Sequence, residues 1–131
     1  LNISIDKGDT KIKKLYKQSQ MFLFTYDSTG FLENYIYDIP SIIFCNKNYL
    51  NSINEKFYPR YKDLQKNQIM FTDEKNLAKH INSIWDETDK WWQSEKTKSS
   101  LENFNKDLNN KPYIGCLDDL KSKLFFKKTN E

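Results

Sequence analysis

The sequence predicts an α/β domain built on a mostly parallel sheet. Three apolar runs, at residues 21–24, 42–44 and 69–71, are each too short for a helix and are typical of buried strands. Segments with apolar residues at helical spacing lie between these runs. Strands that alternate with helices need crossover connections, so we expect parallel pairing with helices packed against the sheet.

The expected elements of the first half follow one another at short intervals. The first helix places Ile12, Leu15 and Tyr16 on one face. Pro40 ends the second helix before the third strand, because the residue before a proline avoids the helical conformation. The chain opens with Leu1 rather than Met, so we expect a piece of a longer protein. The predicted elements are a strand at 1–5, a helix at 10–20, a strand at 21–25, a helix at 29–37 and a strand at 41–44.

The second half is expected to continue the alternation and to close with helices. Pro59 is expected to interrupt or kink a short helix over residues 53–65. The segment Thr72-Asp73-Glu74 offers an N-cap and acidic first-turn residues for the helix after the strand at 69–71. The remaining predicted features are a buried stripe of Leu77, Ile81, Ile84 and Trp85, a helix with Leu101, Phe104 and Leu108 inward, a break at 111–115 and a last helix at 117–126.

Composition sets looser bounds on the class of protein. With 131 residues, 37% of them hydrophobic and 15% aromatic, the chain is long and apolar enough for one domain with its own core. Its 21 basic and 18 acidic residues are interspersed and leave a net charge of only +3. A field this weak argues against a site for a nucleic-acid backbone.

Cysteine usage and hydropathy favour a cytoplasmic protein without a metal or cofactor. Cys45 and Cys116 lie far apart and match no metal or redox spacing, and two cysteines do not make a disulfide framework. A reducing setting is therefore the simplest interpretation. No apolar run approaches the roughly 20 residues that span a bilayer, and no secretory signal pattern opens the chain.

The loop between the strand at 21–25 and the helix at 29–37 is the best candidate binding site. Ligands of parallel sheets bind at the carboxyl ends of the strands, where this loop lies. The hydroxyls of Ser28 and Thr29, together with the free N–H groups and positive dipole end of a helix, suit a phosphate. Gly30 permits close approach by a phosphate or by the neighbouring strand. Lys47, after the next strand, is a candidate contact to the donor phosphate or the acceptor.

Four segments carry a resemblance to a known family: Thr25 to Glu33, Ile39 to Phe44, Lys79 to Asp86, and Trp91-Trp92. Together they look like the C-terminal part of a family of bacterial surface-carbohydrate transferases. That family is similar to GT-B glycosyltransferases, and its Ser-Thr and Glu-then-Pro pattern is also similar to CDP-glycerol glycerophosphotransferases. The resemblance covers roughly residues 1 to 108, and the combination of motifs is more specific than any one of them.

The resemblance implies a three-layer Rossmann-like domain, part of a GT-B C-terminal half, that binds a nucleotide-activated sugar or polyol donor. Ser28, Thr29 and Gly30 would hold the donor phosphates, and Glu33 would hold the ribose hydroxyls. A partial donor-binding domain would occupy residues 1–110, followed by a C-terminal helical extension at 111–131. The catalytic base would come from an N-terminal domain of the same protein, so no catalytic residue is assigned and the fragment is expected to be inactive alone.

Plainer roles compete with the binding roles at several positions. Ser28 or Thr29 can serve as an N-cap. Glu33 fits no capping box, and it can be an ordinary solvated acid near the positive end of a helix. Asp27 would repel a phosphate, so we expect it to turn away or to bind backbone N–H groups. His80, the single histidine, is expected to be structural or on the surface, because no nucleophile motif accompanies it.

The tryptophans and lysines also have plain alternatives. We expect Trp85, Trp91 and Trp92 to pack in the core rather than to stack on a sugar. Lys11, Lys13, Lys14 and Lys17 are expected on a solvated helix face, and a phosphate or peripheral membrane role for them stays open.

Two other function classes remain beside the transferase. A non-catalytic α/β interaction domain would keep the apolar strands but would not need Ser28, Thr29 and Glu33 together. A single-stranded nucleic-acid binder would use the many aromatic and lysine residues, although the interspersed acids argue against it.

Overall fold

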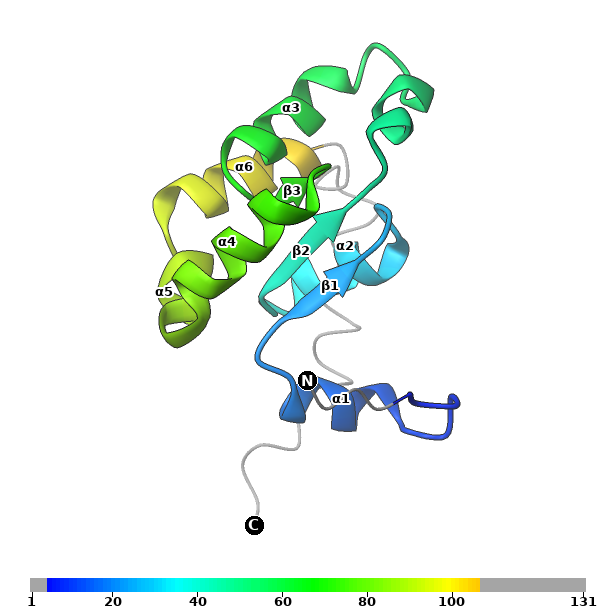
Figure 1. The fold of residues 1–131 in the computed structure, drawn as a ribbon, viewed down its shortest axis with the longest axis vertical. Coiled ribbons are helices and arrows are strands. Elements are labelled where there is room, and N and C mark those ends of the chain that lie inside the picture. The colour runs from blue at the N-terminus through cyan, green and yellow to red at the C-terminus, as the bar shows by residue number, and fades with distance from the viewer. Residues whose placement is uncertain (1–4, 107–131) are drawn as a thin grey trace.

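The computed structural model describes residues 5–106 and has a parallel three-stranded sheet at its centre (Figure 1). The strands are β1 (Phe22–Phe24), β2 (Ser41–Phe44) and β3 (Met70–Phe71), in the order β1-β2-β3. Phe22 lies opposite Ser41 and Ile43 lies opposite Met70, and both pairings are parallel. The predicted parallel sheet with helical crossovers is therefore confirmed.

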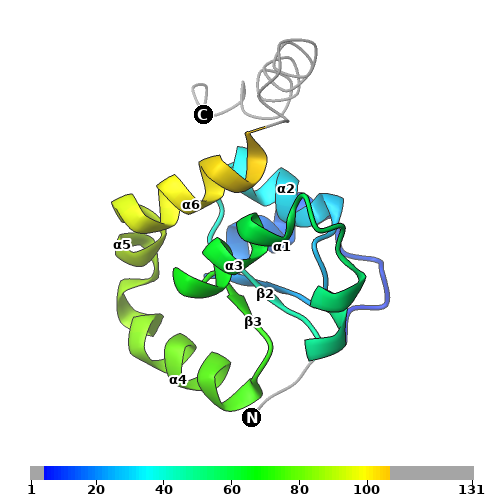
Figure 2. The ribbon, with the colours of Figure 1, turned by 90° about the horizontal axis from the view of Figure 1, so that it is seen from above.

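Helices cover both faces of this sheet. Because successive residues of a strand point to opposite faces, Ile43 packs under α2 (Thr29–Ile36), α3 (Tyr58–Lys66) and α6 (Glu95–Asn105), whereas Ile42 packs under α4 (Glu74–Ile84). Figure 2 shows the two helical layers on either side of the sheet. The helices are α1 (Ile12–Gln18), α2 (Thr29–Ile36), η1 (Lys47–Ser52, a 3₁₀ helix), α3 (Tyr58–Lys66), α4 (Glu74–Ile84), η2 (Trp85–Glu87, also 3₁₀), α5 (Thr88–Trp92) and α6 (Glu95–Asn105).

Several predicted elements form as expected. α2 begins at Thr29, and β2 covers the four predicted residues. Asp73 is the N-cap of α4, and its side chain accepts a hydrogen bond of 2.9 Å from the backbone N–H of Asn76. Trp92 is 1% exposed and packs in the larger core cluster, so its predicted core role is confirmed.

Pro59 does not kink a helix, contrary to the prediction. Pro59 lies in the first turn of α3. The N–H groups of a first turn have no acceptor within the helix, so the missing N–H of proline costs no hydrogen bond there, and the fixed φ of proline is already helical. The preceding polar residues form η1 instead, and the side chain of Asn46 caps it by accepting from the N–H of Asn48 at 2.9 Å.

One predicted core position, Trp85, is wrong, and the apolar face predicted for the first helix is only partly buried. Trp85 is 50% exposed, because α4 ends at Ile84 and the chain continues as the 3₁₀ turn η2, which rotates Trp85 out of the stripe. Ile12 is 53% exposed, since α1 has no buried residue and packs mainly through Tyr16, whose ring meets Phe22 edge-on at 5.2 Å. Helical spacing identifies a face, but the number of elements around that face decides its burial.

Some predictions fall outside the described residues. The helix at 117–126, the boundary at 110 and the extension at 111–131 all lie there, as do residues 1–4 of the first predicted strand. Ile5, which is described, is not in a strand. None of the helices within 5–106 is long and apolar enough to cross a membrane.

Candidate functional site

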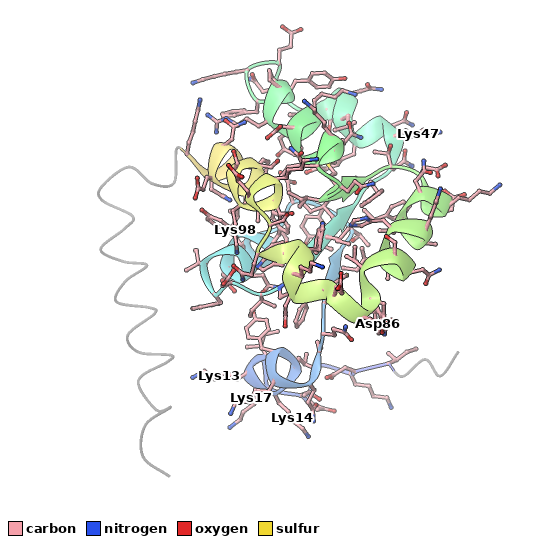
Figure 3. All side chains as sticks on the ribbon, turned by 90° about the vertical axis from the view of Figure 1, so that its left-hand side faces the viewer. Lys13, Lys14, Lys17, Lys47, Asp86 and Lys98 are labelled. Atoms are coloured by element: carbon pink, nitrogen blue, oxygen red, sulfur yellow. The ribbon has the colours of Figure 1, made fainter. Side chains whose placement is uncertain are left out.

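The carboxyl ends of all three strands open into a hollow of about 540 Å³, here called the carboxyl-edge hollow. Lys47 lies there with its side chain exposed, and it forms no ion pair with the described residues (Figure 3). Lys47 shares the lining with the carboxylate of Glu74 and with amides and hydroxyls, a set of groups that suits a polar ligand. The lining residues are Thr25, Phe44, Asn46, Lys47, Asn48, Thr72 and Glu74.

The start of α2 keeps its polar groups unpaired. Ser28 occupies the N-cap position with an extended backbone, but its hydroxyl makes no capping hydrogen bond. The N–H of Phe31 bonds to the carbonyl of Ser28 at 3.0 Å, whereas the N–H groups of Thr29 and Gly30 meet no acceptor within residues 5–106. The hydroxyl and both N–H groups are therefore available to an anion.

Gly30 has a packing role. A Cβ built on Gly30 would lie 3.0 Å from Cε1 of Phe24 and 3.4 Å from Oγ of Ser28. The missing side chain thus lets the first turn of α2 rest directly on the ring of Phe24, which belongs to β1. Of the two predicted reasons for this glycine, the structure shows the close approach of the neighbouring strand.

Glu33 is exposed one turn further along α2, and its carboxylate has no hydrogen bond or ion pair with the described residues. Burial raises the pKa of Tyr16 and Tyr37, and the nearby charge of Glu33 raises both further. The structure brings Lys47 to the carboxyl-edge hollow, and it leaves Ser28, Thr29, Gly30 and Glu33 outside the lining of that hollow.

Asp27 is held by two tyrosines that sequence reasoning did not connect with it. One carboxylate oxygen accepts from the hydroxyl of Tyr49 in η1, and the other accepts from the hydroxyl of Tyr61 in α3. We call these three residues the Asp27 clamp. Asp27 was expected to turn away or to bind backbone N–H groups, and its partners are side chains instead. The tyrosines stand 22 and 34 residues away in sequence, so no local pattern links them to Asp27.

Cys45, beside the clamp, is not a nucleophile. Burial raises the pKa of its thiol to about 11, and the charge of Asp27 adds to the rise. Burial also raises the pKa of Tyr61, as do its hydrogen bond to Asp27 and the charge of that carboxylate. Because only a thiolate attacks efficiently, the neutral thiol of Cys45 serves as a small packing group.

His80 is buried, as the structural alternative requires. Its ring lies between Phe71, at 5.2 Å, and Trp91, at 5.3 Å, and only 5% of the residue is exposed. Burial lowers the pKa of the imidazole, which favours the neutral form. His80 also lines a second hollow, of about 480 Å³, between the end of α3 and α4, together with Lys66 and Lys79.

Metal-ligating residues do not cluster in the part of the chain that the structure describes. No group of three or more His, Cys, Asp and Glu side chains within 5–106 could hold a metal ion.

The hollow and the start of α2 both lie at the carboxyl edge of the parallel sheet. Comparison with curated proteins gives no match, and comparison with solved structures gives none. A family model described as LIC12162 family transferase matches residues 1–118. Since this match covers most of the 131 residues, the chain belongs to the LIC12162 family of transferases.

Proposed function

We propose that this chain is the donor-nucleotide-binding portion of a glycosyltransferase-like enzyme with GT-B organisation. The enzyme would transfer an activated sugar or polyol phosphate in surface polysaccharide biosynthesis. The observation that carries the proposal is the start of α2, where the hydroxyl of Ser28 and the N–H groups of Thr29 and Gly30 lack partners among residues 5–106. Membership of a transferase family and the parallel sheet support it.

The proposed chemistry is electrostatic stabilisation of a departing phosphate. Ser28, Thr29 and the N–H of Gly30 would hold the donor diphosphate, and Lys47 would neutralise part of its charge. Glu33 would accept hydrogen bonds from the ribose hydroxyls. As the bond to the transferred group breaks, the α2 dipole and these donors would stabilise the negative charge that develops on the leaving group. The base that activates the acceptor would lie in another part of the enzyme.

Titration of the ¹⁵N-labelled protein with UDP, CDP, CMP and GDP tests this proposal. We expect amide shifts at residues 26–33 and 46–48 for at least one diphosphate, and weaker shifts for CMP. Ser28→Ala, Glu33→Ala and Lys47→Gln should each weaken binding by about tenfold, since each removes a charge-assisted hydrogen bond. Ser99→Ala, Glu102→Ala and Lys75→Gln are matched controls, because all three positions are exposed and lie on α4 or α6.

Shifts confined to other residues would overturn the site assignment. Nucleotide binding that survives Glu33→Ala and Ser28→Ala unchanged would favour the non-catalytic interaction domain instead. Sugar transfer by the isolated chain would contradict the assignment of the base to another part of the enzyme.

We also propose that α1 contacts an anionic membrane surface. Lys13, Lys14 and Lys17 project from α1 at the end of the molecule away from Lys47 (Figure 3), and α1 contains no acidic residue. Ile12, on the same helix, is 53% exposed. Each lysine near an anionic bilayer contributes roughly 1 kcal/mol of attraction, so the three together are sufficient for a reversible contact.

Cosedimentation with phosphatidylcholine vesicles, with and without phosphatidylserine, tests the membrane contact. We expect binding only to the anionic vesicles, and a loss of roughly a hundredfold in the K13Q/K14Q/K17Q variant. The control K62Q/K75Q/K96Q removes the same charge from exposed positions elsewhere. Equal binding by both triple variants would show that net charge, and not α1, attracts the chain.

A further inference from the structure

The Asp27 clamp joins three separate parts of the chain at the carboxyl ends of the strands. Asp27 belongs to the loop after β1, Tyr49 to η1 and Tyr61 to α3. Because each carboxylate oxygen accepts one hydroxyl, the two bonds restrain both the position and the orientation of the carboxylate. The ring of Tyr61 packs edge-on against Phe104 of α6 at 5.1 Å, so the clamp is anchored in the core.

The two halves of the proposed donor site lie immediately beside this clamp. Ser28 and Thr29 follow Asp27 directly and open α2. Lys47 stands two residues before Tyr49, within one turn of the same 3₁₀ helix. The capping bond from the N–H of Asn48 to Asn46 stiffens that turn. A bond between Tyr49 and Asp27 therefore restrains Lys47 relative to the start of α2.

We propose that Tyr49 and Tyr61 are positioning residues that hold Asp27, and thereby fix the spacing between the start of α2 and Lys47 for a nucleotide diphosphate. This inference rests on the function proposed above. A diphosphate needs donors on both sides at a set separation, and a preformed separation avoids the entropic cost of ordering two loops on binding. The hydroxyls of Tyr49 and Tyr61 draw the carboxylate of Asp27 toward η1 and α3.

The first test uses the ligand-free protein and needs no nucleotide. In Tyr49→Phe, the ¹⁵N order parameters of residues 26–30 and 46–48 should fall together, toward the values below about 0.6 that mark flexible backbone. Tyr58→Phe removes the hydroxyl of an exposed tyrosine, and since this hydroxyl makes no hydrogen bond to the described residues, the variant should change neither segment. Unchanged order parameters in Tyr49→Phe would overturn the inference. Asp27→Asn is the second variant, because it keeps the size of the side chain and removes the charge.

The second test is a double-mutant cycle on CDP or UDP binding. In the wild-type background, Lys47→Gln should weaken binding by about tenfold. In the Tyr49→Phe background it should weaken binding by less than about twofold, because a mobile Lys47 no longer contributes at the right distance. A full tenfold effect in both backgrounds would show that the clamp only stabilises the fold. If the wild-type protein binds no nucleotide, the proposed function fails, and the order parameters still decide whether the clamp couples the two segments.

Discussion

The carboxylate of Asp27 accepts hydrogen bonds from the hydroxyls of Tyr49 and Tyr61, so removal of one hydroxyl oxygen should lower the stability of the fold. Tyr61 is 8% exposed, so loss of its hydroxyl would leave one oxygen of the Asp27 carboxylate without a partner in a poorly solvated place. For this reason, hydrogen bonds to charged groups contribute more to the free energy of unfolding than hydrogen bonds between neutral groups do.

We predict that Tyr61→Phe lowers the free energy of unfolding by about 1.5–3 kcal/mol, as expected for a hydrogen bond to a charged group. Urea denaturation followed by circular dichroism measures the change. Tyr58→Phe should stay within roughly 0.5 kcal/mol of the wild type, because its ring is partly exposed and keeps its packing. Equal stability of the two variants would show that the bond to Asp27 contributes nothing.

The contribution of His80 to the free energy of unfolding depends on pH. It can be measured separately because His80 is the single histidine of the sequence. Burial holds its pKa in the folded protein below the ordinary value of 6.5, so the unfolded chain binds the proton more tightly. The contribution is fully present above pH 6.5 and is lost as the pH falls from 6.5 through the folded pKa. We expect the urea midpoint to fall on acidification from about pH 7.5 to about pH 5.5, and to fall less in His80→Gln. The same decrease in both proteins would contradict this.

We predict that the thiol of Cys45 is alkylated much more slowly in the folded protein than in the unfolded chain. Its side chain is 1% exposed, and its thiol pKa is raised to about 11. In a Cys116→Ser variant, we expect no labelling by iodoacetamide at neutral pH until urea unfolds the protein. Rapid labelling of the folded protein, measured by mass spectrometry, would show that the site next to Asp27 opens readily.

At the scale of the element, α2 depends on the absence of a side chain at Gly30. Alanine normally stabilises a helix relative to glycine by about 1 kcal/mol, yet here the added Cβ would press on the ring of Phe24 at 3.0 Å. The contact is with the edge of a side chain, so a smaller residue at position 24 can remove it.

We predict that Gly30→Ala destabilises the protein by about 1 kcal/mol, because the strain exceeds the gain in helix propensity. In the Phe24→Leu background the same change should be neutral or stabilising, and the difference measures the coupling between the two positions. Thermal denaturation of the four proteins gives both values. If the effects of Gly30→Ala and Phe24→Leu on stability are additive, the cost of Gly30→Ala does not come from the contact with Phe24.

At the scale of the whole molecule, Asp38 ties the last helices to the sheet. It has a φ of 58° in the turn between α2 and β2. Its carboxylate accepts from the indole N–H of Trp92 at 2.9 Å and from the amide of Gln93 at 2.8 Å, and it pairs with Lys98. Burial alone would raise the pKa of Asp38, but the hydrogen bonds from Lys98, Gln93 and Trp92 outweigh burial and lower it.

A series at Asp38 separates backbone strain from lost hydrogen bonds. Asp38→Ala should cost about 2–4 kcal/mol, since it leaves the buried indole N–H of Trp92 unpaired and puts alanine in a left-handed conformation. Asp38→Gly removes the bonds without the strain and should cost less than alanine. Asp38→Asn tolerates the conformation and keeps an acceptor, so it should cost least. Urea unfolding measures the loss in free energy of unfolding for each variant. If Asp38→Gly costs as much as Asp38→Ala, backbone strain does not contribute to the cost.

The alternation of strands and helices, the parallel sheet and the start of α2 at Thr29 could be predicted from the sequence. Spacing within about a turn predicts each element and its start, and the alternation of strands with helices then implies parallel pairing. The remaining features depend on contacts between residues that are far apart in the sequence. Trp85 is exposed because the chain turns into η2 after α4 and rotates it out of the buried stripe, and Asp27 meets Tyr49 and Tyr61 only because the sheet brings β1, η1 and α3 together. The burial of a side chain and the pairing of a charge depend on residues that are distant in the sequence, and only the tertiary fold brings those residues together.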